Sequence, residues 1–319
     1  MPAEPQGLLG QAEFRTKGPL ARQFGLPPFS VLDTKSGDWQ SRRNLWKGLG
    51  IQSELGRDGA LTYEGATAAQ VKYAKDKPKA GRFAEEVTPK KMAGTSIFDP
   101  VLCEICYQWW CPPGGLILDP FAGGSVRGIV ASVGGYRYAG IELRAEQVAA
   151  NRAQLGPNTV GEFRPLWVQG DSAVQLKSPK VPWADFLFSC PPYGNLEPYS
   201  NHPADISNMT YEGFLRVYNE IIALACAKLT DNRFAAFVVG NYREPKTGRM
   251  INFVGDTIRA FEAAGLSFYN DLVLLNSVGT GAMRTNTNFV RGNRKVVKMH
   301  QNVLVFVKGD PAAAVKSFG

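Results

Sequence analysis

The pattern of hydrophobic and polar positions changes near residue 95, from short scattered clusters to apolar runs that alternate with amphipathic stretches. The runs have strand length and end in glycine or polar residues, and helical periodicity lies between most of them. The predicted strands are 115–121, 137–143, 165–171, 184–190, 234–242, 266–276 and 301–309. Because strands that alternate with helices usually pair in parallel, the pattern predicts an α/β fold with a doubly wound, mainly parallel sheet.

The last two predicted strands have no helical segment between them. We therefore expect 266–276 and 301–309 to pair as an antiparallel hairpin, with 277–300 as a long loop inside it. The sheet would then have seven strands, mostly parallel, and end in an antiparallel C-terminal hairpin.

The N-terminal part differs from this α/β pattern. Residues 1–90 are rich in Gly, Pro, Lys and Arg and have few long periodic segments, which predicts an irregular basic segment that contacts an acidic partner. The α/β domain is predicted to span 91–310, and 311–319 is predicted to be a tail.

Charge and cysteine content narrow the function classes. The net charge of +8 favours an acidic partner such as nucleic acid, although a merely basic soluble enzyme also fits. Five cysteines are an odd number and suit a reducing cytoplasm. A zinc ion at Cys103, Cys106 and Cys111 would lack a nearby fourth ligand, because His202 and His300 are distant in sequence, so no metal is expected.

The N-terminus does not resemble a signal peptide, and no apolar run approaches the roughly 20 residues that span a bilayer, so no membrane contact is expected.

Polar residues end three consecutive predicted strands. Asp119 and the glycine pair at 123–124 follow the first, Glu142 ends the second and Asp171 the third. Such a glycine turn lets backbone approach a ligand, and a carboxylate about 20 residues further on suits ribose hydroxyls. Each residue alone can be a strand end or a helix cap. Together, at the carboxyl ends of neighbouring strands, they predict a nucleoside pocket.

The sequence DPFAGGS at 119–125 resembles the first motif, DPFxGxG, of amino-group DNA methyltransferases, with Ser125 in place of the last glycine. The resemblance implies a Rossmann-like methyltransferase fold and S-adenosylmethionine as cofactor. The cofactor-binding residues it implies are Thr95, Phe98 and Asp99 closing over the methionyl group, Asp119, Phe121 and Gly123 around the methionine end, Glu142 at the ribose and Asp171 at the adenine.

The fourth strand runs into Ser189-Cys190-Pro191-Pro192-Tyr193, which resembles the (Asn/Asp/Ser)-Pro-Pro-(Tyr/Phe/Trp) motif of the same family. The lone pair of an exocyclic amino nitrogen is delocalised into the ring. Acceptors aimed at its two hydrogens localise that lone pair, and a side-chain acceptor and a proline carbonyl can supply them. The prolines stiffen the turn, and Tyr193 offers a face to a base flipped from the duplex. The predicted catalytic residues are Cys190, Pro191, Pro192 and Tyr193.

Cys190 stands where the family has Asn, Asp or Ser, and sulfur is a weak acceptor. Three interpretations stay open. Cys190 replaces serine while the Pro191 carbonyl carries more of the hydrogen bonding, or it is a nucleophile as in enzymes that methylate cytosine C5, or CPPY is only a strand-ending turn. In the C5 family the cysteine follows a proline, which argues against the nucleophile.

A basic stretch without acidic residues occupies the predicted hairpin loop. It carries five candidate DNA-binding cations, Arg284, Arg291, Arg294, Lys295 and Lys298, with Phe289 as a candidate wedge between bases. Arginine and lysine bind phosphates and also read base edges, so 277–300 is the candidate target-recognition element, although a charge run is often only a solvated surface. A second candidate for target contacts is 25–57.

Further polar residues are candidates for the rim of the base pocket. Glu197, Tyr199 and Asp205 follow the CPPY turn, and Gly240 to Arg243 end the fifth predicted strand. Solvated loop positions are the alternative for each of them.

Taken together, the residues and the resemblance predict a site-specific DNA methyltransferase that forms N6-methyladenine or N4-methylcytosine in double-stranded DNA. Four further stretches, 27–46, 96–100, 238–243 and 300–310, resemble phage- and prophage-borne DNA modification methylases, which implies a restriction–modification context, a bacterial cytoplasm and a monomer or homodimer. Methylation of RNA or protein, and a non-catalytic DNA-binding protein that keeps the cofactor pocket, are the alternatives.

Overall fold

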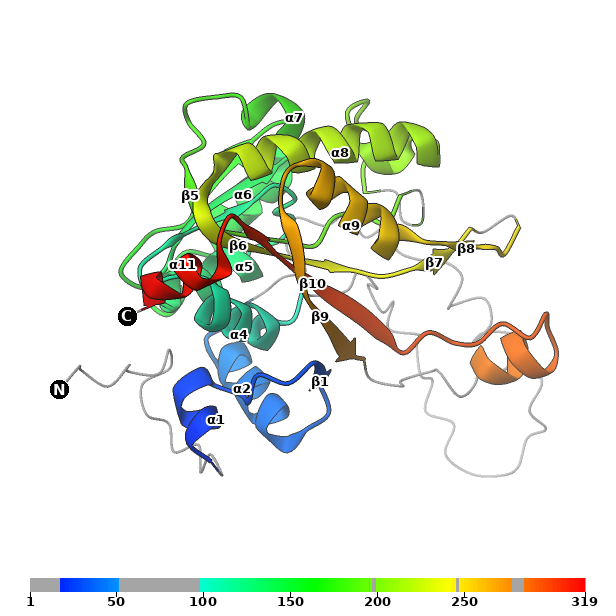
Figure 1. Cartoon of the computed structure of the whole chain (residues 1–319), viewed down its shortest axis with the longest axis horizontal. Helices are drawn as coiled ribbons and strands as arrows, with labels where there is room; N and C mark the ends of the chain where they lie inside the picture. Colours follow the sequence, from blue (N-terminus) through cyan, green and yellow to red (C-terminus); the bar gives the residue numbers. More distant parts are fainter. Residues whose placement is uncertain are drawn as a thin grey trace, which may run out of the picture.

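The computed structural model describes residues 18–51, 98–194, 196, 199–244, 247–276 and 284–318. Its centre is an eight-stranded sheet with the order β1-β9-β10-β6-β5-β2-β3-β4 (Figure 1). The strands are β1 Val31–Asp33, β2 Leu116–Asp119, β3 Arg137–Glu142, β4 Leu166–Gln169, β5 Ala184–Ser189, β6 Leu229–Val239, β9 Ser267–Leu275 and β10 His300–Lys308.

The pairing of the strands confirms the predicted fold class. Strands β2 to β6 pair in parallel, and β10 runs antiparallel to both β6 and β9. The chain moves outward in one direction from β2 to β4 and then resumes on the other side of β2 with β5. Open α/β sheets bind ligands at such a reversal, beyond the carboxyl ends of the strands on either side of it, which here are β2 and β5.

Helices cover both faces of the sheet (Figure 1). One face packs against α2 (Gly37–Gly48), α4 (Pro100–Trp110), α5 (Val126–Val133), α6 (Ala145–Ala153) and α11 (Pro311–Val315), and the other against α7 (Ser172–Gln175), α8 (Tyr211–Lys228) and α9 (Phe253–Ala263). In β5, Phe186 and Phe188 pack on the face covered by α4, and Leu187 packs on the face covered by α8. Because both faces are buried, such strands are apolar at nearly every position, which explains the continuous runs in the sequence.

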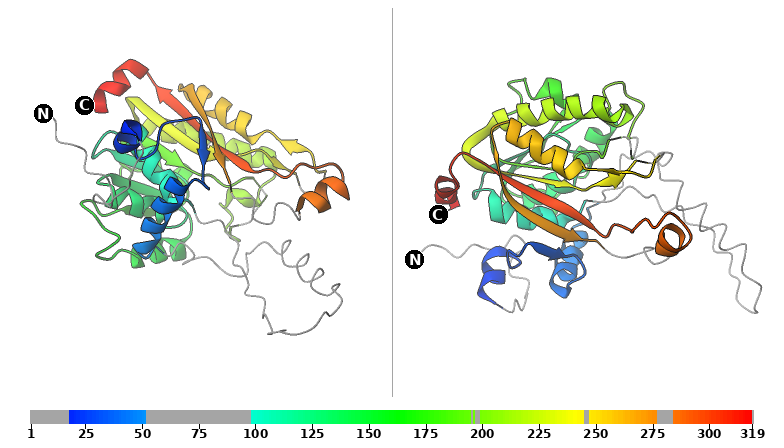
Figure 2. Two further views of the ribbon diagram at one scale, coloured as in Figure 1. Left: turned by 90° about the horizontal axis from the view of Figure 1, so that it is seen from below. Right: turned by 45° about the vertical axis from the view of Figure 1, so that its right-hand side comes forward.

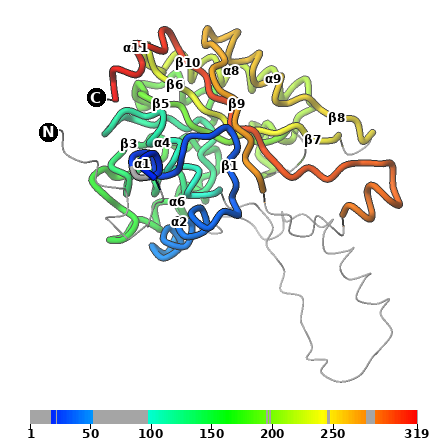
Figure 3. The backbone as a smooth tube through the Cα atoms, turned by 60° about the horizontal axis from the view of Figure 1, so that its bottom comes forward, coloured from blue at the N-terminus to red at the C-terminus, as the bar shows by residue number. Residues whose placement is uncertain are grey.

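The N-terminal segment corrects the prediction of an irregular extension, as far as 18–51 is concerned. It forms α1 (Pro19–Phe24), β1 and α2, and β1 adds an eighth strand by pairing in parallel with β9 (Figure 3). Helix α2 buries Trp39, Arg42 and Trp46, which recur at helical spacing. The arginine interrupts the hydrophobic pattern of this face, so hydrophobicity alone does not reveal the helix.

A buried ion pair fastens α2 to α4. Glu104 accepts hydrogen bonds from the guanidinium of Arg42 and, at 2.9 Å, from the indole Nε1 of Trp46. The side chain of Glu104 is 1% exposed. Burial raises the pKa of Glu104, against the opposing effect of Arg42.

The segments around the sheet are short. Strands β7 (Tyr242–Arg243) and β8 (Met250–Ile251) form a small hairpin between β6 and α9. In the predicted loop 277–300, the described part contains a short helical turn, η3 (Asn286–Val290). At the C-terminus, 311–318 is helical, and Ala314 and Phe318 pack against the same core as α4.

Replacing Glu104 by alanine is expected to lower the free energy of unfolding by about 3–5 kcal/mol, because the buried Arg42 would lose its carboxylate counter-ion. Urea unfolding measures the change. Glu220→Ala is the control, since Glu220 pairs with Lys177 at the surface, 2.8 Å away, and should cost less than about 1 kcal/mol. Equal effects of the two substitutions would contradict the packing role of the N-terminal segment.

Candidate functional site

The polar residues predicted to bind a ligand lie where β2, β3, β4 and β5 end. Since these strands are parallel, their carboxyl ends meet at one edge of the sheet. The end of β6 and the start of the antiparallel β10 lie at the same edge. The sheet therefore brings the predicted cofactor turn, the CPPY turn and the base of the basic loop together.

Asp119 is fully buried, and four donors surround its carboxylate. Oδ1 accepts from the backbone N–H of Phe121 at 3.1 Å and from the hydroxyl of Ser189 at 2.5 Å. Oδ2 accepts from Arg127 Nε at 2.5 Å and from the hydroxyl of Tyr138 at 2.7 Å. Because all four donors belong to the protein, the Asp119 carboxylate positions the turn, and its predicted place near the methionine end of the cofactor stays a prediction. It ties the glycine turn after β2 to Ser189, the residue that precedes the CPPY turn.

Arg127 completes this buried network and was not singled out from the sequence. Its Nη2 donates to the carbonyls of Phe121, at 2.5 Å, and Ala122, at 2.8 Å, and its guanidinium lies 4.7 Å from the ring centroid of Phe98. Burial alone would lower the pKa of Arg127, but Asp119 together with Tyr138 and Cys190 raises it overall. An arginine inside the otherwise apolar helix α5, close behind a glycine turn, was the available signal.

The glycine turn rests on a second set of contacts. Gly123 adopts a φ of 52°, its N–H donates to Glu142 Oε2 at 3.0 Å, and its carbonyl accepts from Asn151 at 2.8 Å. Glu142 Oε1 also accepts the backbone N–H of Arg144 at 2.9 Å. Burial raises the pKa of Glu142, although the hydrogen bonds from Arg144 and Gly123 oppose the shift. Arg144 Nε also lies 3.5 Å from Oε1 as an ion pair. A carboxylate has about four acceptor positions, so these partners still leave Glu142 capacity for a ligand, chiefly at Oε2.

Phe121 and Asp171 also lie at this edge. The ring of Phe121 stacks on Tyr218 of α8, with centroids 6.0 Å apart. Asp171 Oδ1 caps α7 by accepting from the N–H of Ala173 at 2.8 Å. The side chain of Asp171 is half-buried, so it remains within reach of a ligand.

Of the three residues predicted to close over the methionyl group, Thr95 lies outside the described residues. Asp99 lies at the start of α4 with internal hydrogen-bond partners, and its predicted contact with the methionyl group stays a prediction. Its Oδ1 caps α4 through the N–H of Val101, and its Oδ2 accepts from Trp39 Nε1 at 2.9 Å and from Arg43. A helix cap and a ligand contact require the same residue type, which is why the sequence does not separate the two roles.

Phe98 packs edge-on against Phe188 of β5, with centroids 5.8 Å apart, and stays half-buried beneath Arg127.

The CPPY turn is packed into an aromatic cluster. The Tyr193 ring lies 6.2 Å from Tyr242 and 5.8 Å from Phe253, centroid to centroid. Its hydroxyl accepts from Gln301 Nε2 at 2.6 Å, a contact across the sheet that the sequence analysis missed. Burial, reinforced by the neighbouring Cys190 side chain, raises the pKa of Tyr193. The phenol is therefore neutral at physiological pH.

Cys190 and Pro192 are half-buried and Pro191 is buried.

Gly194 follows the turn with a φ of 53°. A Cβ there would lie 2.2 Å from the hydroxyl of Tyr242, so only glycine fits this close approach. That hydroxyl is buried and has no hydrogen-bond partner within the described structure.

The end of β6 forms the far side of this rim. Asn241 Oδ1 accepts from the backbone N–H of Val254 at the start of α9, at 2.9 Å. The carbonyl of Asn241 accepts from Lys298 Nζ, also at 2.9 Å. Arg243 donates to the carbonyl of Gly248 in the β7–β8 hairpin.

The five predicted DNA-binding cations occupy different surroundings. Arg284, Arg291 and Arg294 are exposed, and Arg294 lies 5.3 Å from the ring centroid of Phe289. This part of the loop stands away from the body of the molecule (Figure 2). Lys295 lies against Gly248 of the β7–β8 hairpin. Of the five cations in the described parts of the chain, only Lys298 donates a hydrogen bond to the rim beside the CPPY turn.

The loop after the CPPY turn is held by Asp205, which is buried. Its carboxylate accepts from Ser207 and from Ser200, so it organises the loop. The N–H of Tyr199 donates to Ser207 at 3.2 Å. Glu197 lies outside the described residues.

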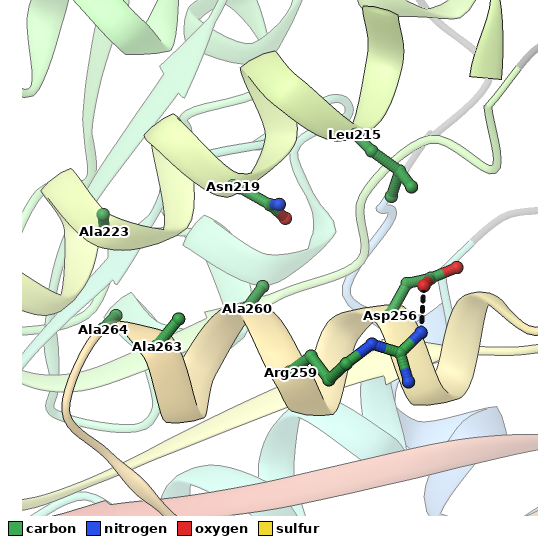
Figure 4. A pocket seen from close by; sticks show the side chains of 8 residues that line it. All are labelled: Leu215, Asn219, Ala223, Asp256, Arg259, Ala260, Ala263 and Ala264. Atoms are coloured by element: carbon green, nitrogen blue, oxygen red, sulfur yellow. Dashed lines mark hydrogen bonds and ion pairs between the residues drawn. The ribbon is translucent and has the colours of Figure 1, made fainter. Parts of the chain in front are cut away.

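A separate groove lies between α8 and α9 (Figure 4). Its volume is about 320 Å³, and Asp256 pairs with Arg259 at one end of it. The predicted site residues do not line it. Its lining is Leu215, Asn219, Ala223, Asp256, Arg259, Ala260, Ala263 and Ala264.

Within the described ranges, no three His, Cys, Asp or Glu side chains are grouped so as to hold a metal ion. Cys103, Cys106 and Cys111 are buried in the core, and burial raises the pKa of each thiol. None of the helices in the described parts combines the length and apolarity that a bilayer crossing demands.

Comparison with known proteins gave matches to solved structures only. No family model and no curated protein matches the chain. TrmN from Thermus thermophilus shares 16% identity over 66% of this chain and 48% of that one, with a TM-score of 0.42, so this chain spans about half its length. A TehB-like SAM-dependent methyltransferase from Corynebacterium glutamicum shares 19% identity over 68% and 90% of the two chains, with a TM-score of 0.40. Magnesium protoporphyrin IX methyltransferase from Synechocystis shares 13% over 62% and 71%, with a TM-score of 0.39. These similarities concern the fold.

Replacing Asp119 by asparagine is expected to lower the free energy of unfolding by about 3–5 kcal/mol, because Arg127 would keep its charge without a counter-ion. Tyr138→Phe is the matched comparison, since it removes one hydrogen bond to the same carboxylate and should cost about 1.5–3 kcal/mol. Denaturant titration of both variants tests the ranking. A smaller loss in Asp119→Asn than in Tyr138→Phe would show that the ion pair does not hold the turn.

Proposed function

We propose that this protein is an S-adenosylmethionine-dependent methyltransferase that modifies the exocyclic amino group of adenine (N6) or cytosine (N4) in double-stranded DNA. One observation carries the proposal. The carboxylate of Asp119 bonds both the N–H of Phe121 in the DPFAGGS turn and the hydroxyl of Ser189 before the CPPY turn. The two motifs that resemble amino-group methyltransferases therefore belong to one rigid assembly at the switch point of the sheet.

The residues around the glycine turn fit the cofactor. A Cβ on Gly123 would meet nothing within 4 Å, so there is open space next to the turn. Glu142, at the end of β3, would accept hydrogen bonds from the ribose hydroxyls, and Asp171, at the end of β4, would accept from the adenine amino group. Phe121 and Phe98 would border the methionine end. When bound, S-adenosylmethionine supplies an electrophilic methyl group on a sulfonium.

The CPPY turn supplies what an amino nitrogen needs. The Pro191 carbonyl and Cys190 would accept the two amino hydrogens and localise the lone pair towards the methyl group. With the cofactor bound, the amino nitrogen held by these acceptors would receive the methyl group and give up one proton to solvent. Tyr193 is uncharged and held in place by Gln301, so it would border the flipped base with a fixed ring. Stiff prolines keep these acceptors in position before the base arrives.

The basic loop supports a nucleic-acid substrate. Arg284, Arg291 and Arg294 project from the edge that carries the CPPY turn, and exposed cations without carboxylate partners bind phosphates. None of these three arginines forms an ion pair with another described residue.

The proposal is tested by expressing the chain in a host without DNA methylation and analysing the nucleosides of its DNA by mass spectrometry. N6-methyldeoxyadenosine or N4-methyldeoxycytidine is expected, and neither in Pro191→Ala or Tyr193→Ala. Purified protein with radiolabelled S-adenosylmethionine is then offered duplex DNA, RNA and protein. Labelled RNA or protein without labelled DNA would replace the proposal by the alternative substrate. Cofactor-dependent DNA binding without transfer would point to a non-catalytic protein.

Cys190 variants separate the amino-group reaction from attack by a thiolate. Cys190→Ser restores the residue common in the family, and we expect it to keep methyl transfer within about tenfold of wild type or better. Cys190→Ala should be slower, because one acceptor is lost. A nucleophilic Cys190 would instead give 5-methylcytosine, and both variants would be inactive.

Cofactor affinity should depend on pH through Glu142. Because its pKa is raised above the usual 4.5, Glu142 takes up a proton at a higher pH than an ordinary glutamate as the pH falls, and its affinity for ribose hydroxyls falls with it. Calorimetry should therefore show binding that weakens as the solution becomes mildly acidic. Glu142→Gln should bind about 10- to 100-fold more weakly at neutral pH and lose this pH dependence. An unchanged pH profile in Glu142→Gln would remove Glu142 from the cofactor site.

A further inference from the structure

Lys298 differs from the other cations of the basic loop in its surroundings. Its ammonium lies on the rim at the end of β6, where it donates to the carbonyl of Asn241. An ammonium has three donors, and in the part of the chain that the structure describes this is its one hydrogen bond, with no carboxylate within ion-pair distance. The Lys298 side chain is exposed at the surface, although packing of its end beside Gly240 lowers the pKa of the ammonium.

Gly240 makes the room that Lys298 occupies. A Cβ at position 240 would lie 2.6 Å from Nζ and 3.6 Å from Cε of Lys298, and the next atom, Gln301 Cα, is 3.9 Å away. The space above Gly240 is therefore filled by the end of the lysine side chain. A larger residue there would displace the ammonium and little else.

The sheet places this lysine next to the CPPY turn. Ser189 of β5 pairs with Phe237 of β6, and Asn302 of β10 pairs with Val239. Gly240 is thus the first residue beyond the paired part of β6, with the CPPY turn on one side and the start of β10 on the other. The hydrogen bond between Gln301 and Tyr193 crosses this position.

We propose that Lys298 binds the phosphate of the target nucleotide itself, whereas the outer arginines of the loop bind the flanking DNA. The inference rests on the proposed function. When a base leaves the duplex and enters a pocket, its phosphate stays at the pocket mouth, and a compact ammonium with free donors is a suitable partner for it. Gln301 of β10, which fixes Tyr193 through a hydrogen bond, acts as a positioning residue.

The two kinds of contact have different kinetic signatures. A flanking phosphate is bound whether or not the base has flipped, so losing its partner weakens DNA binding and raises KM. The phosphate of the target nucleotide reaches Lys298 only in the productive complex. Lys298 therefore stabilises the transition state, and replacing it lowers kcat.

The experiment compares five variants of the full chain on DNA from a methylation-deficient host, with radiolabelled S-adenosylmethionine. Lys298→Gln should lower kcat about tenfold or more. Arg291→Gln, the matched control from the exposed part of the same loop, should raise KM severalfold and leave kcat unchanged. Arg291→Gln should also reduce the slope of log affinity against log salt by about 1, because it removes a phosphate contact made on binding, whereas Lys298→Gln should leave that slope unchanged.

Gly240→Ala provides a test in which the lysine remains. By displacing the ammonium it should lower kcat as Lys298→Gln does, and the double variant Gly240→Ala/Lys298→Gln should be no slower than Lys298→Gln alone. Melting temperatures within about 2 °C of wild type would show that the fold is intact. Lys298→Arg should recover part of the lost kcat.

Two results would overturn the inference. Lys298→Gln with the kinetics of Arg291→Gln would make Lys298 another flanking contact, and a Gly240→Ala variant with wild-type kinetics would show that the position of the ammonium is unimportant. The wild-type protein separates this failure from that of the proposed function, since absence of methyl transfer to DNA by wild type would overturn both.

Discussion

The site depends on one buried ion pair, between Asp119 and Arg127. Asp119 and Arg127 are removed from water, and a buried ion pair is tolerated only when its remaining polar atoms are also bonded. Here the missing partners come from the two turns: the carbonyls of Phe121 and Ala122 bind the guanidinium, and Ser189 binds the carboxylate. Moving either turn would leave a charge unsatisfied in the interior. The positions of the two turns are therefore set by the electrostatics of the core beneath them.

This arrangement divides the polar residues of the edge into two groups. Asp119, Asp99 and Asp205 have their carboxylates filled by internal donors, and they fix turns and helix starts. Glu142 and Lys298 are only partly satisfied within the described structure and face the rim. Rigid inner contacts hold reactive groups in place before a substrate arrives, and unfilled donors and acceptors are left to bind it.

The local chemistry of the sequence predicts much of this. Continuous apolar runs give the strands, their alternation with helices gives the parallel sheet, and the two turns fall where strand order reverses. The sequence does not distinguish a ligand-binding aspartate from one that caps a helix or holds a turn, and Asp99 and Asp119 are examples. Contacts between distant strands are also hidden: Gln301 reaches Tyr193 only because β10 inserts between β9 and β6. Helix α2 was missed because its buried face includes Arg42, whose partner Glu104 lies 62 positions away.

The structure also explains why Cys190 matters for the proposed reaction. Ser189, the stronger acceptor next to it, already donates its hydroxyl hydrogen to Asp119 and is fully buried, so it does not substitute for Cys190 at the base. The amino hydrogens would then depend on a weak sulfur acceptor and on the Pro191 carbonyl. A main-chain carbonyl cannot be moved by a side-chain rotation, so its usefulness depends on how rigidly the turn is held. The bond from Ser189 to Asp119, one residue before Cys190, supplies that rigidity. On this view the buried ion pair offsets the loss of the usual acceptor, and loosening it should harm an enzyme with Cys190 more than one with serine.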